Sequence, residues 1–241
     1  MNDAWNVDSV RCDSDNCRTN SRTEETLGKL RILDLFCGAG GAARGLNDAG
    51  FTVVGVDIKP QPNYPFEFHQ ADALTYPLEG FDAYWASPPC QAYVDANSRG
   101  KKDTKHPRLI EPIRALLQGS GKPYIIENVA GAPLLEPVTL CGTMFDLRVL
   151  RHRKFECSFP VLDIPECNHW GTVSTGEFVG VYARGGKGPR HGRGVREPSP
   201  RPAKVTPEEA MGIGWMTFKE LTQAIPPAYS EFLGRQLWEV S

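Results

Sequence analysis

A short apolar run that ends in two prolines and a cysteine constrains the fold of this chain more than any other stretch. Phe81–Ala86 is apolar enough to form a buried strand, and Ser87-Pro88-Pro89-Cys90-Gln91 follows at once. Because proline has a fixed φ and no backbone N–H, the strand must end here and the loop is stiff. We therefore expect Cys90 at the carboxyl edge of a sheet, where open α/β folds bind their ligands.

Two further segments also place polar or glycine residues directly after an apolar strand. Upstream, the predicted strand Leu30–Phe36 precedes the turn Gly38-Ala-Gly40-Gly41 and a helix at about 42–49. Glycine suits such a turn because the backbone can take unusual φ values and let a ligand come close. Downstream, the predicted strand Tyr124–Ile126 precedes Glu127-Asn128-Val129.

An acidic residue ends the next predicted strand, Thr52–Val56. Asp57 follows the glycine turn by about twenty residues, which is the spacing expected of a carboxylate that accepts hydrogen bonds from a ribose. This pattern alone fits a dinucleotide site as well as S-adenosylmethionine. The rest of the site favours the second, because Cys90 and Glu127 have no role in hydride transfer.

Taken together, these segments resemble the cytosine-C5 DNA methyltransferase family. The cofactor loop of the family matches Phe36–Gly41, its nucleophile loop Pro88–Gln91 and its acid loop Glu127–Val129. The resemblance implies an α/β, Rossmann-like methyltransferase fold with a mostly parallel sheet flanked by helices. It also implies S-adenosyl-L-methionine as cofactor, double-stranded DNA with a flipped cytosine as substrate, and a small irregular target-recognition subdomain.

The resemblance assigns roles to individual residues. Cys90 adds to C6 of cytosine, Glu127 meets N3, Arg153 steadies the base O2 or a phosphate, and Arg151 supports the site. A thiolate suits this step because it is intrinsically nucleophilic, more so where its pKa is depressed. The cofactor-binding residues implied are Phe36, Gly38, Gly40, Gly41, Asp57, Ile58, Asp72, Ala73 and Pro88.

Two positions depart from the pattern of the family. Val149 stands two positions before Arg151, where the family usually has glutamine, and Thr222-Gln223 replaces the usual Gly-Asn of the final motif. Any polar contact that the family makes at these places is therefore in question.

The chain divides into four predicted parts. Thr206-Pro-Glu-Glu209 begins the last part with a capping box, Thr206 as N-cap and Glu209 three residues later. Within the second part we expect a helix over His106–Gln118 and strands or edge segments at Thr139–Phe145 and Leu147–Phe155. The parts are a disordered or loosely attached leader (1–27), a cofactor-binding and catalytic domain (28–155), a target-recognition region (156–204) and C-terminal helices that return to the catalytic domain (205–241).

Charge is distributed unevenly along the chain. Residues 151–204 hold ten basic and five acidic side chains, a net charge of +5, while the whole chain carries −2, so the remainder carries −7. A basic segment on an acidic body is typical of a phosphate-binding face, although a solvated loop is the simpler interpretation.

The cysteines do not indicate a disulfide framework or a metal site. There are seven of them, an odd number, and Cys12 and Cys17 lie alone in the leader. Cys157, Cys167 and His169 could supply three zinc ligands, but their irregular spacing favours ordinary thiols and a surface histidine.

No apolar run is long enough to span a membrane, so we expect a cytoplasmic enzyme. The compact length and small recognition region suggest an enzyme of a phage or bacterium, which we expect to be monomeric and without an obligate protein partner.

Two alternatives stay open at this stage. The short, glycine-rich recognition region leaves room for the same chemistry on RNA or a free cytosine nucleotide. The altered final motif leaves room for a non-catalytic DNA-binding protein that keeps the cofactor fold.

Overall fold

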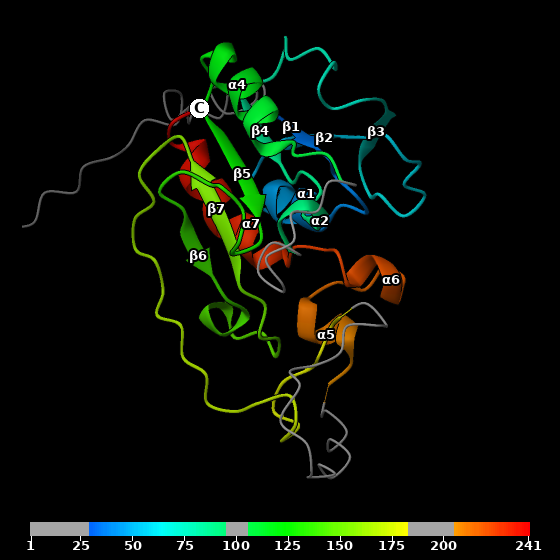
Figure 1. The fold of residues 1–241 in the computed structure, drawn as a ribbon, viewed down its shortest axis with the longest axis vertical. Helices are drawn as coiled ribbons and strands as arrows, with labels where there is room; N and C mark the ends of the chain where they lie inside the picture. The colour runs from blue at the N-terminus through cyan, green and yellow to red at the C-terminus, as the bar shows by residue number, and fades with distance from the viewer. Residues whose placement is uncertain (1–28, 95–105, 183–204) are drawn as a thin grey trace, which may run out of the picture.

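A single seven-stranded sheet organises the chain, with strand order β3-β2-β1-β4-β5-β7-β6 (Figure 1). The computed structural model describes residues 29–94, 106–182 and 205–241. The predictions for the leader and for the part of the recognition region at 183–204 lie outside the described residues.

Five neighbouring strands of the sheet run parallel, and β7 runs opposite to both of its neighbours. The reversed β7 lies between β5 and β6, which distinguishes this sheet from the dinucleotide-binding order 3-2-1-4-5-6. The strands are β1 (Arg31–Leu35), β2 (Thr52–Asp57), β3 (Glu67–Gln70), β4 (Ala83–Ala86), β5 (Tyr124–Asn128), β6 (Val138–Leu140) and β7 (Arg153–Cys157).

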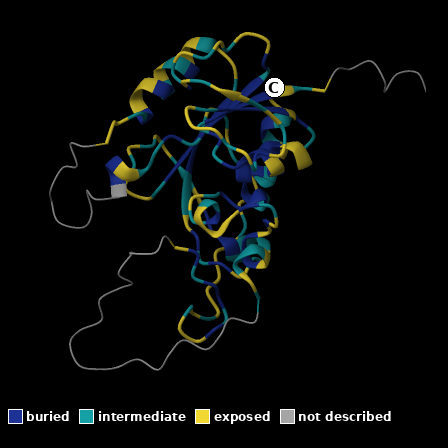
Figure 2. Ribbon diagram, turned by 90° about the vertical axis from the view of Figure 1, so that its right-hand side faces the viewer, coloured by how far each residue is buried: buried dark blue, intermediate teal, exposed yellow. Residues whose placement is uncertain are grey.

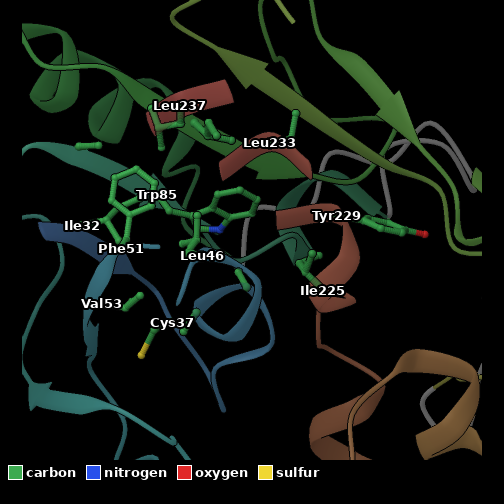
Figure 3. Packing of buried hydrophobic residues seen from close by; sticks show 14 of the residues in the cluster. Ile32, Cys37, Leu46, Phe51, Val53, Trp85, Ile225, Tyr229, Leu233 and Leu237 are labelled. Atoms are coloured by element: carbon green, nitrogen blue, oxygen red, sulfur yellow. The ribbon is translucent and has the colours of Figure 1, made fainter. Parts of the chain in front are cut away.

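Helices cover both faces of the sheet, as the continuous burial of β4 and β5 requires. On one face, α1 (Gly41–Asp48) and α7 (Pro227–Trp238) pack together over Trp85 (Figure 3). On the other face, α4 (Ile110–Ser120) buries Ile113 and Leu117. These layers confirm the predicted α/β class, and Figure 2 shows the buried strands between more exposed helix surfaces.

The segment from 138 to 157 corrects the sequence-based expectation. Only Val138–Leu140 and Arg153–Cys157 are strands, while a 3-10 helix, η1 (Gly142–Phe145), and an irregular stretch lie between them. The apolar residues there pack into the core without pairing along a strand: Val149 makes only an isolated bridge with Val179. Apolar character predicted burial correctly, but not backbone conformation.

Among the C-terminal helices, α7 packs against the sheet and against α1. Helix α5 (Pro207–Met211) begins with the expected capping box, in which the Thr206 hydroxyl accepts a hydrogen bond from the Glu209 N–H. Helix α6 (Phe218–Leu221) follows, and α7 then packs on α1. The Trp215 indole N–H also donates to the carbonyl of Ala39, 3.0 Å away, which ties this part of the chain to the glycine turn.

Residues 158–182 form no helix or strand of their own apart from the Val179 bridge. Phe178, Val179 and Val181 are nevertheless buried, the last two against Met211 of α5. The boundaries of a recognition region at 156–204 stay a prediction. Among the described residues, we find no helix that is both long enough and apolar enough to cross a membrane.

Candidate active site

The carboxyl ends of four neighbouring strands bring the predicted cofactor residues to one edge of the sheet. The glycine turn follows β1, Ile58 follows β2, Asp72 follows β3 and Pro88 follows β4. Because these strands are parallel and adjacent, their following loops lie side by side. The structure therefore places the predicted set in one region of the fold.

The glycine turn after β1 requires an unusual backbone. Phe36, Gly38 and Gly40 all have positive φ, at 58°, 51° and 82°. A Cβ added at Gly38 would meet nothing within 4 Å, whereas one at Gly40 would lie 2.7 Å from Cδ of Pro65. The turn thus leaves open space at Gly38 where a ligand can approach, while Gly40 is needed for close packing.

Asp57 links the glycine turn to the end of β2. Its Oδ2 accepts a hydrogen bond from the Gly38 N–H (3.1 Å), and its Oδ1 accepts one from the Lys59 N–H (2.9 Å). Next to it, Ile58 is 65% exposed. A carboxylate beside an uncovered apolar side chain fits a nucleoside, which offers ribose hydroxyls and a flat base.

Asp72 and Ala73, which follow β3, lie in different environments. Asp72 is exposed, and its Oδ1 accepts a hydrogen bond from the Leu74 N–H at 2.9 Å, which is the turn role expected of an isolated aspartate. Its second oxygen has no hydrogen bond within the described part of the chain. Ala73 is buried in the core on the α4 side of the sheet.

The loop that carries Cys90 is fixed from both sides. The Ser87 N–H donates to the Leu35 carbonyl (3.0 Å), and the Asn128 side-chain amide donates to the Pro88 carbonyl (2.8 Å). Cys90 then precedes the short helix α2 (Gln91–Val94) and stays partly accessible. The prolines and these two bonds hold the thiol at the sheet edge.

Glu127 and Arg153 form an ion pair next to this loop. Arg153 Nε lies 3.3 Å from Glu127 Oε1, and Glu127 is buried. The antiparallel register of β5 and β7 explains the contact, because β7 begins where β5 ends. Residues from β4, β5 and β7 thus meet at one end of the sheet.

The pKa values of the two reactive groups are both raised. Burial raises the pKa of Glu127, and the charge of Arg153 offsets only part of this rise. Burial also raises the pKa of Cys90, with a further rise from the Glu127 carboxylate. The surroundings of Cys90 therefore favour its thiol form.

Arg151 points away from this pair, toward the C-terminal segment. It is buried, and its Nη2 donates to the carbonyl of Thr222 at 2.5 Å. Its Nη1 lies 3.4 Å from the Val181 carbonyl and 3.5 Å from that of Leu221. Burial lowers the pKa of Arg151 to about 10. These hydrogen bonds join the segment just before β7 to the altered final motif.

Asn128 and Ser87 are the site residues that the sequence-based prediction omitted. Asn128 is almost fully buried and clamps the cysteine loop to the acid loop, and the Ser87 side chain acts as a hydrogen-bond partner of Glu127. Both flank predicted residues in the sequence, so adjacency to Pro88 and Glu127 was the signal that could have found them.

The residues at this edge match a known family. Residues 30–136 match the family described as C-5 cytosine-specific DNA methylase. The type II methyltransferase M.DdeI of Desulfomicrobium norvegicum is 25% identical over 117 residues, and M.FnuDI of Fusobacterium nucleatum is 30% identical over 113. Each alignment covers 42% of this chain but only 28% and 33% of those relatives, so the chain matches about a third of their length.

A solved structure extends the likeness of the fold beyond the matched stretch. The methyltransferase EhMeth of Entamoeba histolytica superposes with a TM-score of 0.61 at 13% identity, over 88% of this chain and 98% of that one. At this identity the likeness concerns the fold alone.

Proposed function

We propose that this chain is a member of the cytosine-C5 DNA methyltransferase family and that it transfers a methyl group from S-adenosyl-L-methionine to C5 of a cytosine in duplex DNA. The observation that carries the proposal is the convergence of Cys90 with the Glu127–Arg153 pair, whose ionic atoms lie 3.3 Å apart. The charges of both residues act on the thiol, so the three groups work as one unit.

The edge formed by β1, β2 and β3 fits S-adenosylmethionine. Open space at Gly38 admits the ligand to the backbone, Asp57 offers carboxylate oxygens to the ribose, and Ile58 offers an apolar surface to adenine. The uncommitted oxygen of Asp72 can accept a hydrogen bond from the adenine amino group. When bound, the cofactor supplies an electrophilic methyl group on a sulfonium.

Cys90 makes C5 reactive by adding to the neighbouring carbon. Its thiolate forms a bond to C6, which breaks the aromaticity of the ring, and Glu127 donates a proton to N3 as negative charge builds there. C5 then carries the electron pair that takes the methyl group. Removal of the C5 proton, for which water is a sufficient base, expels the thiolate, and the N3 proton returns to Glu127, so that the ring is restored.

Glu127 and Arg153 have complementary roles in that sequence. The raised pKa of Glu127 favours the protonated form that N3 needs, and the Arg153 guanidinium stays close to steady the base O2 or an adjacent phosphate. The target cytosine must leave the duplex to reach Cys90, at a cost of a few kcal/mol that contacts in the pocket recover.

A single experiment tests the proposal: nucleoside mass spectrometry on DNA from a host that lacks cytosine methylation of its own. We expect 5-methylcytosine with the native chain, and none with Cys90→Ala. Cys157→Ser is the matched control, since this thiol lies on β7 and outside the unit formed by Cys90, Glu127 and Arg153. Full methylation by Cys90→Ala would overturn the proposal.

The same chemistry on RNA or a free nucleotide is the second candidate. Residues 158–182 contain no regular element beyond one bridge, which gives a small surface for reading a long duplex. Methyl transfer to duplex DNA, tRNA and dCMP should be compared directly. Transfer to tRNA or dCMP without transfer to duplex would favour this candidate.

A further inference from the structure

Two cysteines and two histidines from three separate segments meet below the β6–β7 edge. Cys141 follows β6, His152 immediately precedes β7, and Cys167 and His169 belong to the irregular stretch after β7. The Sγ atoms of the cysteines and the ring nitrogens of the histidines all lie within 4.8 Å of one another.

Three of the six distances among these four atoms are close to the edges of a coordination tetrahedron. Sγ of Cys167 lies 3.1 Å from Nε2 of His169 and 3.5 Å from Nε2 of His152, and Sγ of Cys141 lies 3.4 Å from Nε2 of His169. Zinc bonds of about 2.0–2.3 Å place neighbouring tetrahedral ligands about 3.3–3.8 Å apart. Since all four atoms lie within 4.8 Å of one another, small adjustments would bring them around a common ion.

We propose that Cys141, His152, Cys167 and His169 bind one structural zinc ion. Two thiolates and two imidazoles in a tetrahedron are typical of zinc, and four protein ligands leave no open position for catalysis. The Thr143 hydroxyl supports the set from outside, 3.6 Å from Sγ of Cys141 and 3.8 Å from Sγ of Cys167. Such outer contacts orient the ligands of metal sites.

This site differs from the zinc ligands considered from the sequence. Cys157 lies on β7 and does not join the cluster, while Cys141 and His152 replace it. The spacing of these residues along the chain does not predict the cluster, because Cys141 and His152 come close to Cys167 only through the β6–β7 turn. The proposed site departs from the expectation that the chain holds no metal.

The ion would fasten an irregular segment to the catalytic sheet. Residues 158–170 form no helix or strand, and the ligand residues Cys167 and His169 are both exposed on this segment. His152 lies between Arg151 and Arg153, and its carbonyl accepts a hydrogen bond from Arg153 Nη1 at 2.9 Å. A metal at His152 would thus fix the start of the recognition region and also the backbone beside Arg153. The effect on Arg153 rests on the proposed function, whereas metal binding does not.

Metal analysis of the purified full chain tests the site independently of methylation. We expect one zinc per chain by elemental mass spectrometry, and retention of this zinc in Cys157→Ser. Cys167→Ser and His169→Ala should each weaken zinc binding by more than about 100-fold, because even outer-shell changes cost about 10–100-fold. Cobalt exchanged into the native chain should give the intense absorption of a tetrahedral thiolate site.

Stability measurements on the native chain cover the case in which a ligand variant fails to fold. A chelator should lower the Tm of the native chain and of Cys157→Ser alike, and added zinc should restore it. Native protein that holds iron instead of zinc, holds no metal and ignores added zinc, or contains a Cys141–Cys167 disulfide would overturn the proposal. Zinc binding without methyl transfer would leave the site intact and remove only the proposed function.

Discussion

In the proposed mechanism, Cys90 and Glu127 share one proton in the state that reacts. The thiol starts from the higher ordinary pKa and is raised further, so the carboxyl loses its proton first as pH increases. In the reactive form, Cys90 is a thiolate and Glu127 is protonated. In the resting form, Cys90 is a thiol and Glu127 is a carboxylate. Both forms contain the same number of protons. Its population therefore rises with pH as the first proton leaves the pair and falls as the second leaves.

The variant Glu127→Gln removes the titration of the carboxyl group and leaves that of the Cys90 thiol. Glutamine cannot ionise and no longer raises the pKa of Cys90, so kcat/KM should rise with pH on the alkaline side, where that of the native enzyme falls. Near neutral pH we expect activity to fall by about 10²–10⁴-fold, the range typical of a general acid. The alkylation rate of Cys90 by iodoacetamide, measured against pH, checks the thiol pKa without DNA. Parallel pH profiles for the two proteins would contradict this coupling.

At the scale of elements, the packing of α1 on α7 depends on the absence of a side chain at Gly45. A Cβ there would clash with the Pro227 carbonyl and the Ser230 hydroxyl and lie 2.6 Å from the Glu231 amide nitrogen. Two of these atoms are backbone, so α7 would have to move. Gly119 in α4 is the matched control, because a Cβ there meets nothing within 4 Å.

Alanine at these two positions should have opposite effects. We expect Gly45→Ala to lower the free energy of unfolding by about 1–3 kcal/mol through overpacking, despite the better helix propensity of alanine. Gly119→Ala should be neutral or raise it by up to about 0.5–1 kcal/mol, the usual cost of glycine in a helix. Urea denaturation of both variants gives the comparison, and equal effects would show that the packing of α1 on α7 does not depend on Gly45.

The central strands and the helix caps could be predicted from the sequence, whereas interactions between distant segments could not. Apolar runs and glycine turns located β1, β2, β4 and β5 because each is a local signal, and the Thr206 box began α5 as expected. The cluster of Cys141, His152, Cys167 and His169 and the Arg151–Thr222 hydrogen bond depend on chain topology instead. That bond also explains how the altered motif is tolerated: Arg151 binds the carbonyl of Thr222, which any residue supplies.

On the scale of the whole molecule, the proposed binding to DNA must overcome the negative net charge of the residues outside 151–204. Residues 151–204 carry a net charge of +5, and the rest of the chain carries −7. Since each neutralised phosphate releases counterions, the dependence of log K on log salt reports how many phosphates are neutralised, at about 0.9 for each one in duplex DNA. If residues 151–204 contact the phosphates, the slope should depend on the number of ion pairs that this segment makes with phosphates. It should not depend on the net charge of the whole chain.

Two triple variants with the same change in net charge distinguish these cases. Replacing Arg190, Arg193 and Arg196 with glutamine should reduce the salt slope by up to about 0.9 for each phosphate that is no longer neutralised. The same replacement at Lys29, Lys122 and Lys219, which are exposed on the body, should leave the slope nearly unchanged. Fluorescence anisotropy with a labelled duplex over a salt series measures both. Equal reductions of the salt slope in the two variants would mean that only the net charge of the chain affects binding. The basic segment would then be a solvated loop rather than a phosphate-binding face.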